Sequence, residues 1–166
     1  LSMRPEPIGF RLTLAAGNEM EMLKSGEPEG EATSRDAFRY VYQATVSWAT
    51  GVGRGLLVEG GLYPSHIGCE SPLPRDNWNY TQGWAGNLTP SYQTGLKASC
   101  SFTDTLSGQL HIVNGWQITA DNNDRSSFGA QLAWTPAVGR MGSIVLNTWY
   151  GPELAGNDDD VRTLLD

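Results

Sequence analysis

The sequence predicts an all-β protein: an antiparallel up-and-down meander that forms part of a transmembrane β-barrel. Apolar and polar residues alternate with a period of two in successive segments, as extended strands with unlike faces require. The connections between these segments alternate between long and short. Outer-membrane barrels have this asymmetry, with tight turns at one rim and long loops at the other.

The clearest unit is the hairpin at residues 38–63, in which FRYVYQATVSWA and GLLVEGGLY flank the short connection TGVGR. In its first strand Tyr40, Tyr42, Ala44, Val46 and Trp48 lie on one face. Its aromatic residues stand at the strand ends and its middle is small and aliphatic. A sandwich core about 10 Å thick would place the large rings in the middle instead.

About seven strands are expected, in a single domain that spans residues 1–166. The predicted strands cover residues 8–16, 38–49, 55–63, 91–102, 106–115, 126–134 and 141–150. Long polar connections are predicted at 17–36 and 64–90; EMEMLK in the first could form a helical turn, and WNYTQGWAGNL in the second a short helix or a loop. The end of the chain reads as an acidic loop, 157–160, running into an eighth strand that is cut off. We therefore expect an incomplete barrel, an N-terminal or central fragment of a larger one.

Composition narrows the function classes. The net charge of −7 argues against nucleic-acid binding, which normally needs a basic face. No apolar run approaches the roughly 18 residues of a membrane-spanning helix, although barrel strands would not produce one. Cys69 and Cys100 form neither a disulfide framework nor a metal-binding spacing. Met3 lies inside the opening LSMRPEPIGF, so the first residues are expected to be the middle of a longer precursor.

The aromatic residues at the strand ends are predicted to anchor a barrel at its two membrane interfaces. Strands of about 10 residues, rising about 3.3 Å each and tilted about 45°, span roughly 23 Å, close to the apolar band of a barrel. The interface candidates are Tyr40, Tyr42, Trp48, Tyr92, Phe102, Phe128, Trp134 and Tyr150. The alternative is a secreted soluble β-sandwich that binds a carbohydrate or a protein, since sandwich strands also alternate.

The opposite face is small and polar, which suits a wet lumen. The pore-lining candidates are Arg39, Gln43, Glu59, Lys97, Gln109, His111, Gln131 and Asn147. Arg39, Glu59 and Lys97 could set ion selectivity, as rings of charge do in pores. They could equally form ion pairs between neighbouring strands, and both interpretations remain open.

No constellation indicates an enzyme, a metal site or a cofactor. No nucleophile motif surrounds the serines that could partner His111. Residues 121–124 and 157–160 have the composition of a calcium loop without its spaced ligands, and His66, Cys69 and Glu70 match no zinc spacing. The aromatics Trp78, Tyr80 and Trp84 could form a sugar-stacking platform, a constricting loop, or a loop that packs its own rings.

Several segments in order, GRGLLVEGGLYPSHIGCE, RDNWNYT, SYQTGLKASCSFTD, NGWQITADNND and YGPELAGNDDD, resemble the OmpL-like β-barrel porin family of the porin-2 type. The resemblance runs from about residue 9 to the end of the chain. It implies a bacterial outer-membrane channel, with the lipid bilayer and small hydrophilic solutes as its partners, and family members longer than this chain. It transfers no catalytic residue, and it leaves the solute and any homo-oligomer open.

Overall fold

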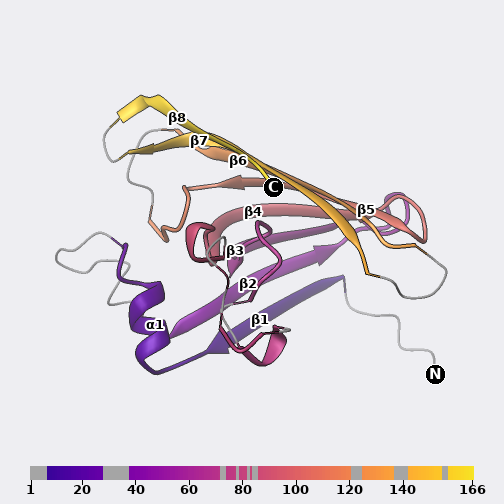
Figure 1. Cartoon of the computed structure of the whole chain (residues 1–166). Coiled ribbons are helices and arrows are strands. Elements are labelled where there is room, and N and C mark those ends of the chain that lie inside the picture. Colours follow the sequence, from indigo (N-terminus) through magenta and orange to yellow (C-terminus); the bar gives the residue numbers. More distant parts are fainter. Residues whose placement is uncertain are drawn as a thin grey trace.

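The computed structural model describes residues 7–27, 38–71, 74–77, 79–81, 83, 86–120, 125–136, 142–154 and 157–166. Within them lies one antiparallel sheet of eight strands, in which each strand pairs with its neighbours in sequence (Figure 1). The strands are β1 (Ile8–Leu14), β2 (Val41–Ala49), β3 (Leu57–Pro64), β4 (Tyr92–Ser101), β5 (Leu106–Val113), β6 (Ser127–Trp134), β7 (Ile144–Leu154) and β8 (Asn157–Leu165). The prediction of an all-β, up-and-down antiparallel meander is confirmed.

Helical structure in the described residues is confined to short pieces of the long connections. Helix α1 (Asn18–Leu23) is the turn expected from EMEMLK, and 3-10 helices η1 (Pro74–Asp76) and η2 (Gly86–Leu88) lie in the second long connection. Over the same described residues, no helix has the length and apolar character needed to cross a membrane.

The sheet curls into an open trough, with β1 at one end and β7 and β8 at the other (Figure 1). The tight connections β2–β3 and β4–β5 lie at one rim, and α1 lies at the opposite rim (Figure 1). The first residues of the connection between β3 and β4 lie inside the trough, where His66 contacts β6 and β7. Across the described residues there is no second sheet packed on the first, so the sandwich alternative does not describe this fold.

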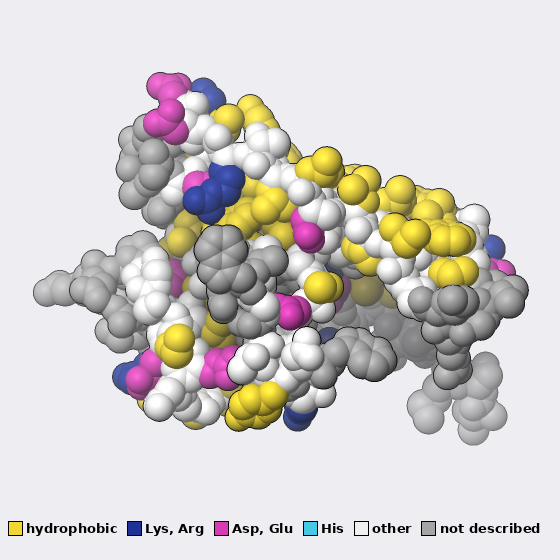
Figure 2. All heavy atoms as spheres, in the orientation of Figure 1, with side chains coloured by type: hydrophobic (Ala, Val, Ile, Leu, Met, Phe, Trp, Pro, Cys, Tyr) yellow, Lys and Arg dark blue, Asp and Glu magenta, His cyan; other side chains and the backbone are white. Residues whose placement is uncertain are grey.

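The two faces of the sheet differ sharply. Large apolar side chains on the convex face are exposed, among them Phe10 at 87% and Leu110 at 67%. Figure 2 shows hydrophobic side chains gathered over the part of the sheet that holds β5 to β8. On the concave face, by contrast, the buried apolar side chains Tyr63, Ile67, Val113 and Trp149 form a cluster. The hydrophobic core of this fold is therefore local and lies within the trough.

In the described residues the sheet has the expected seven strands and an eighth at the end of the chain. The prediction of an acidic loop at 157–160 was wrong. These residues begin β8, which pairs with β7 from Leu154↔Asn157 to Thr148↔Leu165. The acidic run has no apolar alternation, which is the signal used to find strands. A strand that runs beyond the apolar part of the sheet needs no such alternation, since both of its faces can be polar.

Two glycines allow the backbones of neighbouring strands to approach closely: Gly61 where β3 meets β2, and Gly95 where β4 meets β5. Gly61 pairs with Gly95. Gly61 has φ +128°, and a Cβ atom there would lie 2.1 Å from the carbonyl oxygen of Ala44. A Cβ atom on Gly95 would lie 2.1 Å from the carbonyl oxygen of Ile112. No larger residue fits this contact without moving a backbone.

Candidate functional site: the concave wall and its inner segment

Six of the eight predicted pore-lining residues, all except Arg39 and Gln43, lie in two neighbouring rows across the concave face. Backbone pairing places Glu59 beside Lys97, Lys97 beside His111, and His111 beside Gly129. In the adjoining row, pairing runs from Ser99 through Gln109 and Gln131 to Asn147. Residues that are far apart in the sequence therefore share one wall. The rows follow from strand register, because paired residues in an antiparallel sheet point to the same face.

Glu59 and Lys97 form a cross-strand ion pair. The Lys97 Nζ atom lies 2.6 Å from Glu59 Oε2, and both side chains are mostly buried. The same ammonium group lies 5.0 Å from the centre of the Tyr63 ring. Of the two interpretations left open by the sequence, the structure contains the ion pair between neighbouring strands. A role of these charges in ion selectivity stays a prediction.

The adjoining row consists of uncharged hydrogen-bonding groups. Gln131 Nε2 donates to Asn147 Oδ1 at 2.9 Å, and Asn147 Nδ2 donates to Asp166 Oδ2 at 2.9 Å. Gln109 Oε1 lies 3.2 Å from His111 Nε2. Amides and hydroxyls that remain accessible can exchange hydrogen bonds with water or with a polar solute.

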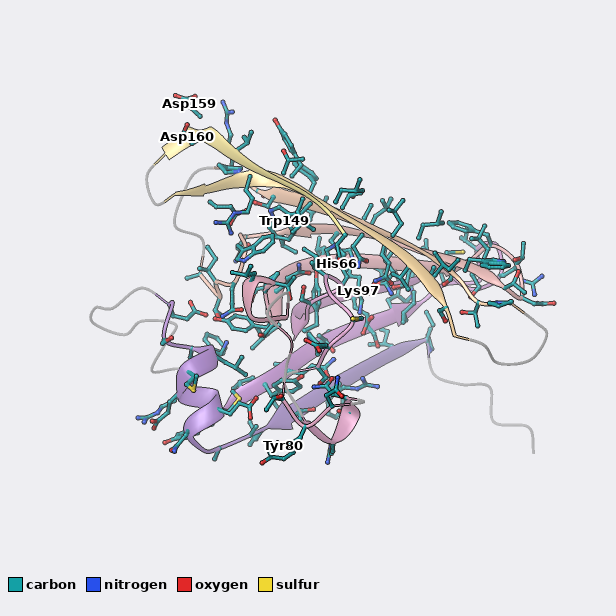
Figure 3. All side chains as sticks on the ribbon, in the orientation of Figure 1. His66, Tyr80, Lys97, Trp149, Asp159 and Asp160 are labelled. Carbon is teal, nitrogen blue, oxygen red and sulfur yellow. The ribbon has the colours of Figure 1, made fainter. Side chains whose placement is uncertain are left out.

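Residues 64–71, which we call the inner segment, lie against this wall. They follow β3 directly, and Figure 3 shows His66 within the trough close to Lys97 and Trp149. The His66 ring stacks on the His111 ring with 3.9 Å between centroids. It also lies 6.4 Å from the Trp149 ring. Burial lowers the pKa of His66, which favours the neutral imidazole in this stack.

Hydrogen bonds tie the inner segment to strands on the far side of the trough. His66 Nε2 lies 3.2 Å from the carbonyl oxygen of Thr148, and His66 Nδ1 lies 3.1 Å from Gln93 Oε1. Gln131 Nε2 donates to the His66 carbonyl oxygen at 2.9 Å. The Gly68 N–H donates to Asp166 Oδ2 at 3.0 Å. The segment thus spans from the end of β3 to β6, β7 and the residue after β8.

Ile67 adds an apolar anchor to these polar contacts. It is buried in the cluster with Tyr63, Val113 and Trp149, against which Trp116 and Leu164 also pack. Trp116 meets Trp149 edge to face, with 5.3 Å between ring centroids. Part of the concave face is therefore packed and dry, whereas the sequence pattern predicted a polar, wet wall throughout. The pattern did not show this because the apolar residue that completes the cluster comes from a connection.

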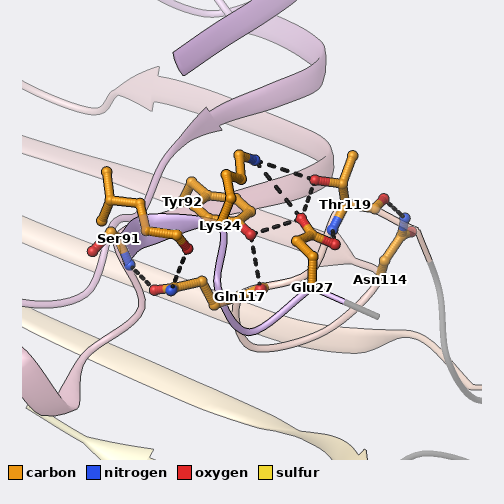
Figure 4. A network of polar contacts seen from close by, with 8 residues as sticks. Lys24, Glu27, Ser91, Tyr92, Asn114, Gln117 and Thr119 are labelled. Atoms are coloured by element: carbon orange, nitrogen blue, oxygen red, sulfur yellow. Dashed lines mark hydrogen bonds and ion pairs between the residues drawn. The ribbon is translucent and has the colours of Figure 1, made fainter. Parts of the chain in front are cut away.

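A second polar cluster joins three long connections at the α1 rim (Figure 4). The Lys24 ammonium lies 3.5 Å from the centre of the Tyr92 ring and 3.7 Å from Glu27 Oε1. Tyr92 Oη donates to Glu27 Oε1 at 2.6 Å, and the Thr119 N–H donates to Glu27 Oε2 at 3.0 Å. Gln117 Oε1 accepts from the Ser91 N–H at 2.7 Å. We call Lys24, Glu27, Tyr92, Gln117 and Thr119 the rim cluster.

Burial dominates the electrostatics of the rim cluster. It lowers the pKa of Lys24 to about 8, because desolvation of the ammonium outweighs the attraction of Glu27. The sequence offered no signal for this cluster, since all of its members except Tyr92, the first residue of β4, come from connections without periodicity. The cluster is recognised only in the folded protein, where these residues come close together.

Two of the predicted site residues, Arg39 and Tyr92, are placed differently from the prediction by contacts with the long connections. Arg39 precedes β2 and pairs with Glu21 of α1, so it does not line the wall between strands. Tyr92 is only 3% exposed, because Lys24 covers its ring and Glu27 takes its hydroxyl proton; it is not an interface anchor. In both cases the long connections supply partners that strand alternation cannot predict.

Tyr42 was also assigned to the wrong face. The β1–β2 register shifts between Thr13 and Leu14, so that Leu14 pairs with Val41 and Tyr42 is skipped. Such a bulge reverses the alternation. Tyr42 instead lines a hollow of about 220 Å³ together with Ser71 and other residues of the second long connection.

The remaining interface candidates are exposed: Tyr40, Trp48, Phe102, Phe128, Trp134 and Tyr150. Trp134 pairs with Leu106 and Ile144 near the tight-turn rim, whereas Phe128 pairs with Tyr150 toward the opposite rim. Their role at a membrane stays a prediction. Tyr80 is exposed, and Trp78, Trp84 and residues 121–124 lie outside the described residues. Gln43 is buried on the concave face.

The sheet and its wall define a protein of the β-barrel type: a curled antiparallel meander with an apolar convex face and a polar concave face. The whole chain, residues 1–166, matches the family model described as putative beta-barrel porin-2, OmpL-like, and the chain belongs to that family. No curated protein and no solved structure matches it. The family resemblance expected from the sequence is thereby confirmed.

Proposed function

We propose that the protein is an outer-membrane channel of a bacterium, through which small hydrophilic solutes or ions diffuse passively and without chemical change. The observation that carries the proposal is the division of one sheet into an exposed apolar face and a polar face. Leu110 and Gln109 illustrate it: they are neighbours in β5, yet Leu110 is exposed on the convex face and Gln109 lies in the polar row.

The convex face has the chemistry of a surface that meets lipid. In water, large contiguous apolar patches are rare because leaving them exposed forgoes about 25 cal/mol per Å² of burial. A row such as Phe10, Val46 and Trp48, all exposed on paired strands, is stabilised when hydrocarbon covers it. Aromatic residues toward both rims fit the two interfaces of a bilayer.

The sheet needs closure to cross a membrane. Over the described residues, β1 and β8 each have one unpaired edge, and backbone groups without partners cost several kcal/mol each in hydrocarbon. We therefore propose channel activity for the closed barrel in which both edges are paired. Membership of a porin family supports the same role.

Reconstitution of the full-length protein tests the proposal. We expect a detergent-dependent protein whose gel mobility changes on heating, and stepwise single-channel currents in planar bilayers. A monodisperse, detergent-free monomer would contradict the membrane assignment. A heat-modifiable barrel without any conductance would contradict the channel and leave the membrane assignment standing.

A further inference from the structure

We infer that the inner segment, residues 64–71, is a fixed constriction of the permeation path and that His66 is the positioning residue that holds it in place. The inference rests on the proposed channel function and adds to it the element that limits solute size. Two observations support it. The first is a space beside Gly129, which we call the seat, that the His66 ring fills; the second is the direction in which the segment crosses the trough.

The seat for His66 exists because β6 has glycine at one position of the wall. A Cβ atom on Gly129 would lie 2.5 Å from His66 Cε1 and 2.8 Å from His66 Nε2. Gly129 pairs with His111 on one side and with Trp149 on the other. The His66 ring therefore fills a gap between two large side chains of the same row, and any other residue at position 129 would occupy that gap.

The segment crosses the trough instead of returning along its own strand. It leaves β3, and its hydrogen-bond partners Gln131, Thr148 and Asp166 belong to β6, β7 and the residue after β8. Backbone atoms of His66 and Gly68 take part in two of these bonds, so the main chain itself is held against the wall. A main chain held in this way narrows the space that the strands enclose.

Its other side faces a hollow of about 220 Å³, which Gly86, Thr89 and Pro90 of the same connection also line. Cys69 is exposed, although Ile67, two residues earlier, is buried in the apolar cluster. Glu70 accepts the Gly83 N–H at 2.7 Å, which connects the segment to a later part of the same connection. The segment is thus packed on the wall through His66 and Ile67, and it leaves Cys69 accessible to a passing solute.

Two substitutions loosen the segment by different routes. His66→Ala removes the ring and its hydrogen bonds, and Gly129→Ala fills the seat. We expect both to raise the single-channel conductance of the full-length protein, on the order of 1.5- to 2-fold, since the narrowest part of a pore limits conduction. Gly108→Ala is the matched control, because a Cβ atom there would meet the Phe102 ring on the convex face and lie 3.4 Å from the Gln131 carbonyl oxygen, but would not reach His66.

A chemical probe at Cys69 provides a second measurement that needs no destabilising substitution. In a Cys100→Ser background, a cationic methanethiosulfonate reagent is expected to lower the single-channel conductance stepwise, and Cys69→Ser is expected to remove that response. The constriction would be contradicted, and the channel function would stand, if the reagent left the conductance unchanged and if His66→Ala and Gly129→Ala conducted as the wild type does. A wild-type protein that never conducts would overturn the channel, and the constriction with it.

Discussion

Glu59 and Lys97 face each other directly across β3 and β4, and their charged atoms lie 2.6 Å apart. The two charges of this pair cancel in the middle of the concave wall, where the adjoining row is made of amides and hydroxyls. A solute that passes this wall therefore meets hydrogen-bonding groups, and the electrostatic field of the paired charges is weak. The pair makes a sharp prediction about selectivity, because removal of either partner leaves a single charge behind.

Lys97→Met is expected to shift the reversal potential of the full-length channel toward cation preference, since it leaves the Glu59 carboxylate unpaired. Glu59→Gln is expected to shift it toward anion preference. Each single variant should also lose about 3 kcal/mol of stability, as happens when one partner of a buried ion pair is removed. Reversal potentials in a salt gradient and urea midpoints measure the two effects.

The double variant Glu59→Gln/Lys97→Met is the control for both readouts. It restores a neutral wall, so its reversal potential should return to the wild-type value. Its loss of stability should be smaller than that of either single variant, because no buried charge remains without a partner. Identical reversal potentials in the wild type and the three variants would show that Glu59 and Lys97 do not lie along the permeation path.

Gly61→Ala is expected to impair assembly of the barrel. The new Cβ atom would lie 2.1 Å from a backbone carbonyl oxygen and would require a φ near +128°, which alanine rarely adopts. We expect a loss of more than roughly 3 kcal/mol, the upper range for backbone strain at one residue. Gly60→Ala is the matched control, since its Cβ atom would meet the flexible end of Leu96 at 3.0 Å and lie an ordinary 4.0 Å from the Gly95 carbonyl oxygen. Equal heat-modifiability of the two variants would contradict the prediction.

The strands of this fold could be predicted because their two faces meet different surroundings. In β5, Leu110 and Gln109 alternate between an apolar exposed face and a polar face, and such alternation is visible in one segment of sequence. The start of β8 could not be predicted in this way, since Asp159 and Asp160 are both exposed (Figure 3). Local patterns also could not show the β1–β2 bulge that turns Tyr42 inward.

The candidate site was only half predictable. The register that brings Glu59 to Lys97 follows from two adjacent strands joined by one connection, so both residues could be placed on one wall. The seat of His66 depends on Gly129 and Thr148, which are far away in the sequence. A glycine at a wall position of β6 is the one local hint, and it gains meaning only once the inner segment is seen to occupy the space.

Ala98→Arg and Ser99→Arg form a matched pair that tests which face meets lipid. The two positions are adjacent in β4; Ala98 pairs with Val58 and Leu110 on the convex face, and Ser99 belongs to the polar row. We expect Ala98→Arg to cost about 2–4 kcal/mol in a bilayer, the cost of arginine at the midplane of a barrel. Ser99→Arg should stay within about 1 kcal/mol, as surface substitutions do. Urea unfolding in liposomes measures both stabilities. If Ser99→Arg were the more destabilised variant, the concave face and not the convex face would be the one that meets lipid.

Lys24 predicts an unusual pH dependence of stability at the α1 rim. Its pKa is lowered by burial from 10.5 to about 8 in the folded protein. At pH 7 the ammonium is protonated in both the folded and the unfolded state, so the two states bind the same number of protons. Between pH 8 and 10.5 the unfolded chain holds a proton that the folded protein has released, and stability therefore rises with pH across this window.

The expected gain from this one group is up to about 3 kcal/mol, from the size of the shift. Lys24→Met isolates it, because every other titrating group is shared by the two proteins. The difference in urea midpoint between the wild type and Lys24→Met should change in favour of the wild type from pH 8 to pH 10.5, and should be constant below pH 7. A difference that is flat over the whole range would mean that Lys24 titrates as it does in water, and that the rim cluster around Glu27 and Tyr92 is open to solvent.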